Sequence, residues 1–527
     1  MKNPRHAEHN AGTLIVTLAT LAGLSVLAAI SLQRVAPKFR MAHQNAAWQE
    51  ARVAAEAGID AAMGDLLRNT TGTATGTWPG WKQSSDGVIG PVLSGTLTPI
   101  TSIISSLLGA GSSGAAMTPQ PIFLDNLNVT TGSGVPTEVD VQLWALQPSE
   151  SADRCWFRIR AMATCALGPT AAQAPDNLDA TLRRFSLRTV RPPLQKDDVG
   201  NPMTIPTPNI SRTVEVLVEP IRPFELALWT DQSLSLGTSG TWRVDSYDSR
   251  DPRKSNPDGT YPGPGSMKVQ ENGSVASNRG RPGNSLRGPL ISANGARVLG
   301  VVATNGGDDP ATEVHENVEG SIALDPSRIR DDFCREMKPA TRPAVRDPEP
   351  APEPGLPFVS GTEAEPRTYL VTGNLGAFTI VPPPPGAKGL IIILINGSLD
   401  IEDALDIPPN VTAVLYVRRD IDFHNHPVNA GPASSNRPGQ LQIYGEDSGR
   451  DPRTLRADSD AAIRAAFYGP TYDVRLTGSV EWCGAIASRS FEMLGGGSGG
   501  IHYDEALGPL GPPICFRIAR YVEDVRE

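Results

Sequence analysis

The sequence has few cysteines, and they follow no pattern typical of a metal site or a disulfide scaffold. The five are Cys155, Cys165, Cys334, Cys483 and Cys515. They are too few and too scattered for a disulfide scaffold, and neither a CxxC pair nor a Cys/His ligand spacing occurs. A Cys155–Cys165 bridge stays open for an oxidising compartment, and the odd count leaves at least one thiol unpaired.

The chain lacks an excess of basic residues, since 47 Lys and Arg stand against 57 Asp and Glu. The chain of 527 residues carries a formal net charge of -10, and phosphate binding needs a basic surface, so we expect no nucleic-acid partner. The sequence contains no GxSxG elbow, no Ser-x-x-Lys set in a convincing context and no phosphate-loop signature. These absences predict that the protein is not an enzyme and takes no cofactor.

Charge is absent altogether from one long stretch near the N-terminus. Residues 11–32 contain no charged side chain, and Thr13 to Leu32 reaches the roughly 20 apolar residues that a helix needs to cross a bilayer. Secretory signal peptides have shorter apolar regions and end at a small-residue cleavage site, usually with no amphipathic helix attached. The stretch therefore predicts one transmembrane helix.

The predicted helix continues beyond this stretch to residue 69. Apolar positions recur at three- and four-residue steps, and charged residues take the other face. The apolar set is Ala55, Ile59, Ala62, Met63 and Leu66, and the charged set is Glu50, Arg52, Glu56, Asp60 and Arg68. Pro37 lacks an amide donor, so we expect it to kink the helix.

Three features of this segment occur together: the leader MKNPRHAEHNAG, a glycine followed by the apolar span, and the sequence Ala55-Glu56-Ala57-Gly58. Over about the first 70 residues they resemble the N-terminus of PilX-type minor pilins. The resemblance implies a leader at 1–12 that a prepilin peptidase cuts between Gly12 and Thr13, and an assembly helix at 13–69. The alternative is an ordinary single-pass anchor.

One position departs from the pilin pattern. Major pilins carry Glu at the fifth residue after the cut, where this chain has Thr17. By resemblance that Glu pairs with the amine of a neighbouring subunit, so Thr17 suggests a minor or tip-located subunit, or one that is never cleaved. The assembly helix would then depend on Thr17, Pro37, Glu56 and Gly58. Basic residues flank both ends of the span, and the resemblance alone places the N-terminus in the cytoplasm and the C-terminus outside.

Strand-like patterns follow a Gly/Ser/Thr-rich loop region at 70–124. Segments 139–146, 154–164 and 212–221 show the period of two of half-buried strands. Behind a long helix, they predict a pilin-like β head at 125–225. The predicted fold class is therefore α+β with a large all-β part.

From residue 226 onward, short apolar stretches alternate with tight turns such as Asn-Gly and Gly-Ser. This spacing favours a right-handed β-helix (solenoid), with a β-sandwich as the alternative. We divide it into residues 226–335 and 367–527, separated by a proline-rich linker at 336–366. One solenoid split by an insertion and two separate domains both stay open. Residues 465–507 resemble the uncharacterised domain that often follows PilX-like leaders.

The densest polar pattern is Asp420, Asp422, His424 and His426, at alternate positions. On a strand their side chains would share one face and could ligate a metal. A solvated strand shows the same alternation, and no further ligand is identifiable, so we predict no metal site.

A second polar set is acidic and comprises Asp400, Glu402, Asp403 and Asp406. Paired carboxylates can cleave glycosides, but nothing in the sequence places a partner acid, and the basic groove candidates Arg418 and Arg419 cannot be placed. We interpret the set as a solubilising edge. We interpret His502 to Glu505 as a packing or capping element at the end of the solenoid.

These observations predict a minor pilin-like subunit of a type IV pilus or a related secretion pseudopilus, with an adhesive or tip role. Its partners would be other pilin subunits, the assembly machinery, prepilin peptidase and the inner membrane, before it reaches the pilus or the cell surface. The alternative is a membrane-anchored β-helix protein that binds or cleaves a surface glycan. A cell-envelope scaffold that never joins a filament is a third option.

Overall fold

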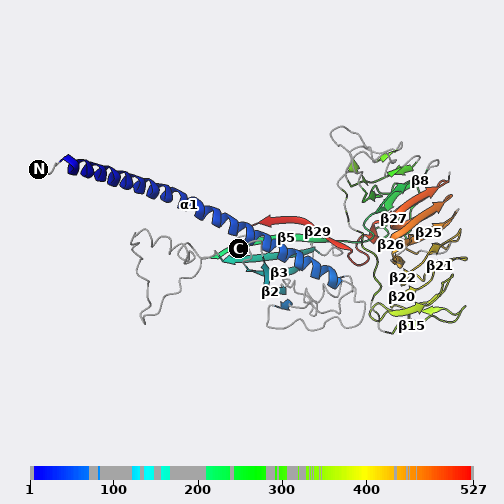
Figure 1. The fold of residues 1–527 in the computed structure, drawn as a ribbon. Helices are drawn as coiled ribbons and strands as arrows, with labels where there is room; N and C mark the ends of the chain where they lie inside the picture. The colour runs from blue at the N-terminus through cyan, green and yellow to red at the C-terminus, as the bar shows by residue number, and fades with distance from the viewer. Residues whose placement is uncertain are drawn as a thin grey trace.

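The computed structural model of the chain has a long helix that leads into a small sheet and a larger β region (Figure 1). The structure describes residues 5–70, 81–83, 122–130, 136–146, 156–166, 209–237, 242–279, 291–292, 296–305, 318–319, 328–330, 333, 335, 337–343, 345, 347–431, 436–446, 449, 451–458, 460–495 and 497–523. Cys155 and most of the predicted loop region 70–124 lie outside these residues. The predicted order, an apolar N-terminal helix followed by a large all-β part, is confirmed.

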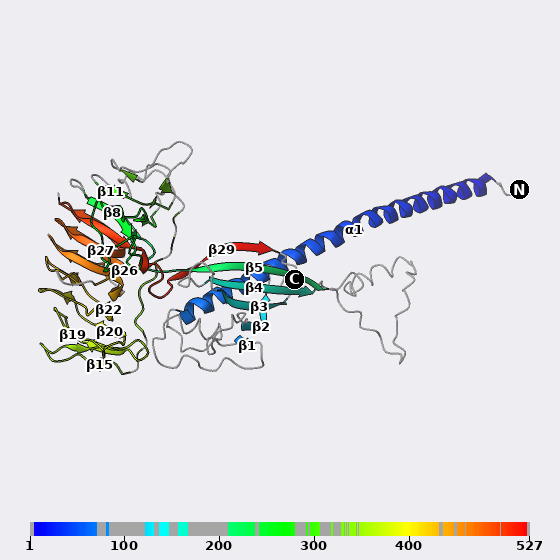
Figure 2. The same ribbon diagram turned by 180° about the vertical axis from the view of Figure 1, so that it is seen from behind.

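The helix α1 (Arg5–Thr70) is continuous over 66 residues. It begins within the predicted leader, because no proline or glycine lies between Arg5 and Ala11. It also continues through Pro37, and Figures 1 and 2 show a gentle curve along its length. The loss of one amide donor at Pro37 therefore does not end the helix, since the hydrogen bonds on either side maintain it.

A six-stranded antiparallel sheet, the head, packs against the C-terminal half of α1 (Figure 2). Its strands, in spatial order, are β1 (Trp81–Gln83), β2 (Ile122–Thr130), β3 (Pro136–Leu146), β4 (Trp156–Ala166), β5 (Asn209–Ile221) and β29 (Cys515–Glu523). Alternate side chains such as Val139, Val141 and Leu143 on β3 are buried against Ala55 and Ile59 of α1. The period of two in the sequence thus marks a sheet with one face under the helix.

The last strand of the head comes from the C-terminus. β29 pairs antiparallel with β5, from Cys515 opposite Ile221 to Glu523 opposite Val214. Placing all of 367–527 in the second part of the solenoid is therefore wrong for residues 515–523. A period-two pattern predicts a strand but does not identify its partner. The larger β region, residues 222–514, is inserted between two neighbouring strands of the head.

The larger β region is built mainly from strands that pair in parallel. Its elements are β6 (Leu228–Thr230), β7 (Leu234–Ser235), β8 (Trp242–Tyr247), β9 (Val275–Ser277), β10 (Ile291–Ser292), β11 (Ala296–Val298), β12 (Val302–Ala303), β13 (Val318–Glu319), β14 (Ile329–Arg330), β15 (Glu349–Pro350), β16 (Phe358–Val359), β17 (Gly361–Thr362), β18 (Arg367–Val371), β19 (Ile380–Val381), β20 (Gly389–Ile395), β21 (Leu399–Asp400), β22 (Val411–Val417), β23 (Ile421–Asp422), η3 (Pro438–Gln440), β24 (Leu441–Gly445), β25 (Arg453–Ala457), β26 (Ala462–Thr477), β27 (Glu481–Leu494), β28 (Gly500–Asp504) and η4 (Glu505–Leu507). β18, β20, β22, β24, β26 and β27 form one series of parallel neighbours. The nearly continuous burial of β20, GLIIILI, is typical of such strands.

The chain enters this stack of strands in its middle. β6 pairs in parallel with β27, and β8 pairs with β28. Residues 228–330 form the strands between this entry point and one end of the stack. Residues 349–504 form the other part, and their strands run in order from the opposite end back to the middle. The two halves therefore meet at a seam formed by β27 and β28 on one side and by β6 and β8 on the other.

The proline-rich segment 336–366 is not a free linker between these halves. Tyr468 donates a hydrogen bond to the Lys338 carbonyl oxygen at 2.6 Å, and Arg342 donates to Asn396 Oδ1 at 2.8 Å. Ala340 also forms a parallel bridge with Glu446. Proline keeps the segment extended, and its neighbours supply the side-chain contacts that hold it along the stack. The described part of the segment is therefore held against the stack by these contacts.

A buried histidine joins the two halves at the seam. His502 on β28 has Nδ1 2.7 Å from Asp245 Oδ1 on β8 and Nε2 2.5 Å from Glu481 Oε2 on β27. The Tyr261 ring stacks on the imidazole with ring centroids 3.8 Å apart, and its hydroxyl donates to Asp245, which Arg243 also contacts. Burial lowers the pKa of His502, but the hydrogen bonds to both carboxylates raise it by more. The imidazolium form is thus favoured at the seam.

This position corrects the expectation for His502 to Glu505. The segment lies at the middle of the stack rather than at its end, because β28 pairs with β8. Its capping role is local: Asp504 accepts a hydrogen bond from the Ala506 amide at the start of η4.

The seam predicts that stability depends on pH. Because the folded-state pKa of His502 is raised, its contribution is fully present below the unfolded pKa and is lost as pH rises through the folded pKa. We expect the melting temperature of the full chain to fall as the pH rises through the folded pKa of His502. In His502→Gln the melting temperature should depend less on pH over the same range. Calorimetry between about pH 5 and pH 9 measures it. His426→Gln is the control, and an unaltered profile in His502→Gln contradicts the prediction.

Candidate functional site

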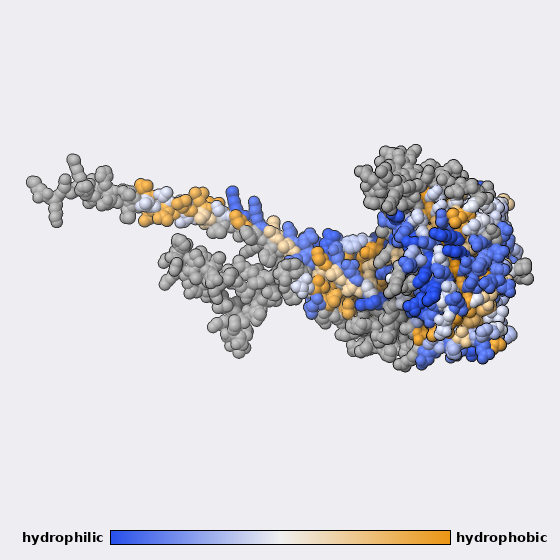
Figure 3. All heavy atoms as spheres, turned by 45° about the vertical axis from the view of Figure 1, so that its right-hand side comes forward, coloured by the Kyte–Doolittle hydropathy of each residue, from blue (hydrophilic) through white to orange (hydrophobic). Residues whose placement is uncertain are grey.

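The N-terminal half of α1 is apolar and exposed. The segment Val16–Val35 spans 20 residues, and its most apolar stretch is 0% buried. Its exposed large side chains are Val16, Leu18, Leu21, Leu24, Val26, Leu27, Ile30 and Val35. In Figure 3 it projects from the protein as a largely hydrophobic rod. Such a surface is long enough to cross a bilayer, and lipid or other apolar helices would remove it from water.

The C-terminal half of α1 packs on the head through small side chains. The buried residues are Ala47, Ala51, Ala54, Ala55, Ile59, Ala62 and Leu66. The predicted apolar face is confirmed at Ala55, Ile59, Ala62 and Leu66, and Met63 packs partly buried against the same cluster. Because most of these side chains are alanine, the helix axis can lie close to the sheet.

Gly58 lies at a point of very close approach between helix and sheet. A Cβ at this position would lie 2.8 Å from Val139 Cγ1 on β3 and 3.2 Å from Ala161 Cβ on β4. The first distance is shorter than carbon atoms tolerate without displacement. The glycine of the Ala55–Gly58 signature therefore has a packing role in this fold.

Glu56 of the same signature connects α1 to the C-terminal strand. The Tyr521 hydroxyl on β29 donates to Glu56 Oε1 at 2.8 Å, and Arg52 Nε donates to the same oxygen at 3.0 Å. Arg52 also lies 3.0 Å from Glu523. Burial raises the pKa of Glu56, but the hydrogen bonds from Tyr521 and Arg52 lower it by more. Sequence reasoning missed Tyr521, which lies 465 residues from Glu56.

The packing at Gly58 can be tested against a second glycine of α1. We expect overpacking in Gly58→Ala to lower the free energy of unfolding by about 1–3 kcal/mol. The better helix propensity of alanine would offset up to about 1 kcal/mol of this loss. Gly64→Ala is the matched control, because a Cβ there meets nothing within 4 Å. It should stabilise the chain by roughly 0.5–1 kcal/mol. Denaturant unfolding of the full chain in detergent measures both, and equal effects contradict the prediction.

The other residues predicted for assembly lie along the exposed part of the helix. Gly12 and Thr13 are both helical, so a cut between them would leave Thr13 at the start of α1. Thr17 is exposed within the apolar segment. Pro37 lies just beyond that segment, before the first buried alanine. The structure therefore brings Glu56 and Gly58 to the head and leaves Thr17 away from it.

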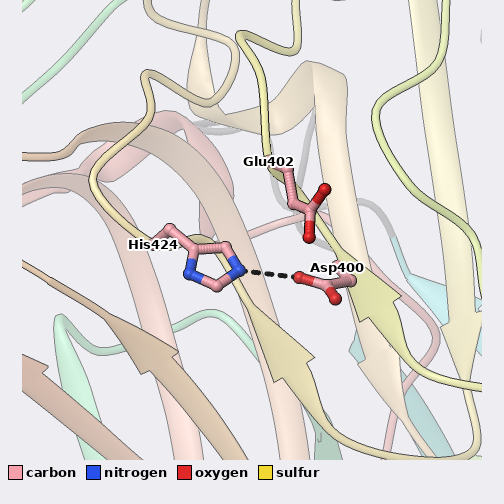
Figure 4. Close-up of side chains that lie close together, drawn as sticks. All are labelled: Asp400, Glu402 and His424. Atoms are coloured by element: carbon pink, nitrogen blue, oxygen red, sulfur yellow. Dashed lines mark hydrogen bonds and ion pairs between the residues drawn. The ribbon is translucent and has the colours of Figure 1, made fainter.

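Part of the two polar sets comes together on the β region (Figure 4). His424 Nε2 lies 2.7 Å from Asp400 Oδ1, and ligand atoms of Asp400, Glu402 and His424 all lie within 4.8 Å of one another. The hydrogen bond to Asp400 raises the pKa of His424 against a smaller lowering by burial. Two carboxylates and an imidazole are the groups here that could hold a divalent cation. The hydrogen bond between His424 and Asp400 accounts for the closeness of these two side chains.

The expected single face of Asp420, Asp422, His424 and His426 is wrong. β23 covers Ile421–Asp422 alone, and His424 has a φ of 46°, which ends the extended backbone. Asp420 Oδ1 accepts from the Thr454 amide at 2.9 Å instead. The alternation in the sequence thus continues through a turn.

The remaining residues of the acidic set have local roles. Asp403 Oδ1 accepts from the Ala404 amide at 2.7 Å, and Asp406 Oδ1 accepts from the Gly431 amide at 3.2 Å. These contacts fix loops beside the stack. Arg418 and Arg419, which the sequence could not place, follow β22 and line a hollow on the side of the β region.

Comparison with known proteins identifies one domain of the chain. A family model described as a domain of unknown function, DUF7305, matches residues 387–510. The match lies inside the β region and ends before β29, the strand that belongs to the head. Among solved structures, the chain is similar to the competence-associated pilin ComZ from Thermus thermophilus, at 10% identity and a TM-score of 0.27, with 91% of this chain and 97% of that chain covered. No curated protein matches the sequence.

Proposed function

We propose that the protein is a minor pilin-like subunit of a type IV pilus or a related secretion pseudopilus, with an adhesive or tip role. The observation that carries the proposal is the division of α1 into an exposed apolar half and a half that packs on an antiparallel sheet. The PilX-like leader and the Ala55–Gly58 signature add to it. The role is structural, and the proposal includes no catalysed reaction.

Assembly would reuse one surface in two environments. The segment Val16–Val35 first holds the subunit in the inner membrane, and then packs among the corresponding helices of other subunits. The head and the β region stay outside. Because the β region is large, it would prevent further subunits from stacking above it, which suits a subunit of low copy number at the tip.

We further propose that residues 222–514 form a right-handed β-solenoid. Parallel pairing between successive strands supports this, as in β20 with β22 and β22 with β24. A second series, β21, β23 and β25, pairs in parallel beside the first. Each level of the stack would then be one coil, and the coils would be displayed beyond the pilin-like head.

The charge-free segment gives a direct test of assembly. Leu24 is 61% exposed in the apolar half, and Val53 is 55% exposed in the half that packs on the head. We expect Leu24→Asp to lose membrane retention and filament incorporation, because an acid at the membrane centre costs about 2.5–3.5 kcal/mol. Val53→Asp is the control and should assemble normally. Quantitative mass spectrometry of sheared filaments measures how much of each variant is incorporated. If Leu24→Asp is incorporated as fully as the unchanged chain, the proposal is contradicted.

Leader processing provides an independent test. Co-expression with a prepilin peptidase should shorten the chain so that it begins at Thr13, and Gly12→Leu should block the cut. Gly23→Leu, on the same helix where a Cβ meets nothing within 4 Å, is the control. Intact mass of the purified chain measures the product. A leader that is retained in every variant favours the single-pass anchor.

A further inference from the structure

Three arginines surround a half-open hollow on the side of the β region. The hollow measures about 320 Å³ and is lined by Asn396, Arg418, Arg419 and Arg453. Its volume lies near the lower end of the roughly 300–1,000 Å³ found for small-ligand sites. In a chain with a formal net charge of -10, Arg418 and Arg419 place two adjacent cations at one small surface.

The stacking of strands brings these side chains together. Asn396 follows β20, and Arg418 and Arg419 follow β22, the next strand of the stack. The Arg418 and Arg419 amides donate to carbonyl oxygens of the β20 level at 3.1 and 3.2 Å. Arg453 begins β25, which pairs with β23. Because paired strands lie roughly 4.8 Å apart, residues on neighbouring levels can contact one ligand.

Two described acidic side chains near Arg418 and Arg419 have hydrogen-bonding partners outside the hollow. Glu446 forms an ion pair with Arg342, and Asp420 Oδ1 accepts from the Thr454 amide and hydroxyl at 2.9 and 3.1 Å. Arg342 also donates to Asn396 Oδ1 at 2.8 Å. The Asn396 amide can therefore offer its NH₂ group to a ligand. The hollow presents cations and hydrogen-bond donors.

We propose that this hollow binds the carboxylate of an acidic sugar unit in a surface polysaccharide. A guanidinium group matches a carboxylate through two parallel hydrogen bonds, and the Asn396 amide can donate to a sugar oxygen. The open side of the hollow lets the rest of a long polymer extend into solvent. This site goes beyond the proposed role in assembly and does not depend on it.

Other polyanionic and acidic ligands fit the hollow less well. Duplex nucleic acid carries one charge per roughly 1.7 Å of its axis, and the formal net charge of -10 opposes its approach. Arginine clusters also recognise acidic and phosphorylated peptides, so an acidic peptide that binds more tightly than the acidic sugar contradicts the proposal. One acidic sugar unit needs only a small cationic site with further donors.

Titration calorimetry of the full chain in detergent, with oligogalacturonate as the probe, tests the proposal. We expect Arg418→Gln and Arg419→Gln each to weaken binding about tenfold or more, because each removes a charge-assisted hydrogen bond. Arg418→Lys keeps the charge without the planar fork and should fall between. Arg297→Gln, at an exposed position of β11, is the matched control and should bind normally. Added salt should weaken binding.

Three results overturn the proposal when the variants melt as the unchanged chain does. They are equal binding of a neutral maltooligosaccharide, unchanged affinity of the Arg418→Gln/Arg419→Gln double variant, and tighter binding of a single-stranded oligonucleotide. Inorganic phosphate that binds as tightly as oligogalacturonate rejects recognition of the sugar. A chain that binds oligogalacturonate normally but never enters filaments supports this site and contradicts the proposed function.

Discussion

The pairing of β29 with β5 is the contact on which the arrangement of the chain depends. It returns the C-terminal segment past the whole β region and makes it the edge strand of the head. The same strand carries Tyr521, which reaches Glu56 of α1. The β region is therefore attached to the head by two adjacent strand ends, which restrict its orientation more than one linker could.

A similar closure occurs inside the β region. Because the chain enters the stack in its middle, the last strands of residues 349–504 must meet the first strands of residues 228–330. His502 lies between Asp245 and Glu481 at that meeting. Its two imidazole nitrogens thus link a carboxylate from each half, and the seam contains a buried polar contact between the strands that meet there.

Sequence periodicity predicted those parts of the fold that depend on residues close together in the chain. The uncharged stretch and the three- and four-residue steps predicted α1 and its buried face, since both depend on side chains within a turn or two. They could not predict that β29 joins the head or that β28 lies beside β8, because alternation identifies a strand and not its partner. At His424 a positive φ ended the strand that alternation had extended. The hollow at Arg418 depends on stacking between levels, which leaves no periodic signal.

The two halves of α1 differ in the size of their apolar side chains, and this difference separates their roles. Alanine side chains and Gly58 let the C-terminal half of α1 pack closely on the sheet of the head. The N-terminal half presents leucine, valine and isoleucine, and Ser25 Oγ donates to the Leu21 carbonyl oxygen of the same helix at 2.8 Å. A hydroxyl that bonds its own helix can enter lipid or a helix bundle at little cost. The N-terminal half is thus suited to lipid or to a helix bundle, while the C-terminal half is already buried against the head.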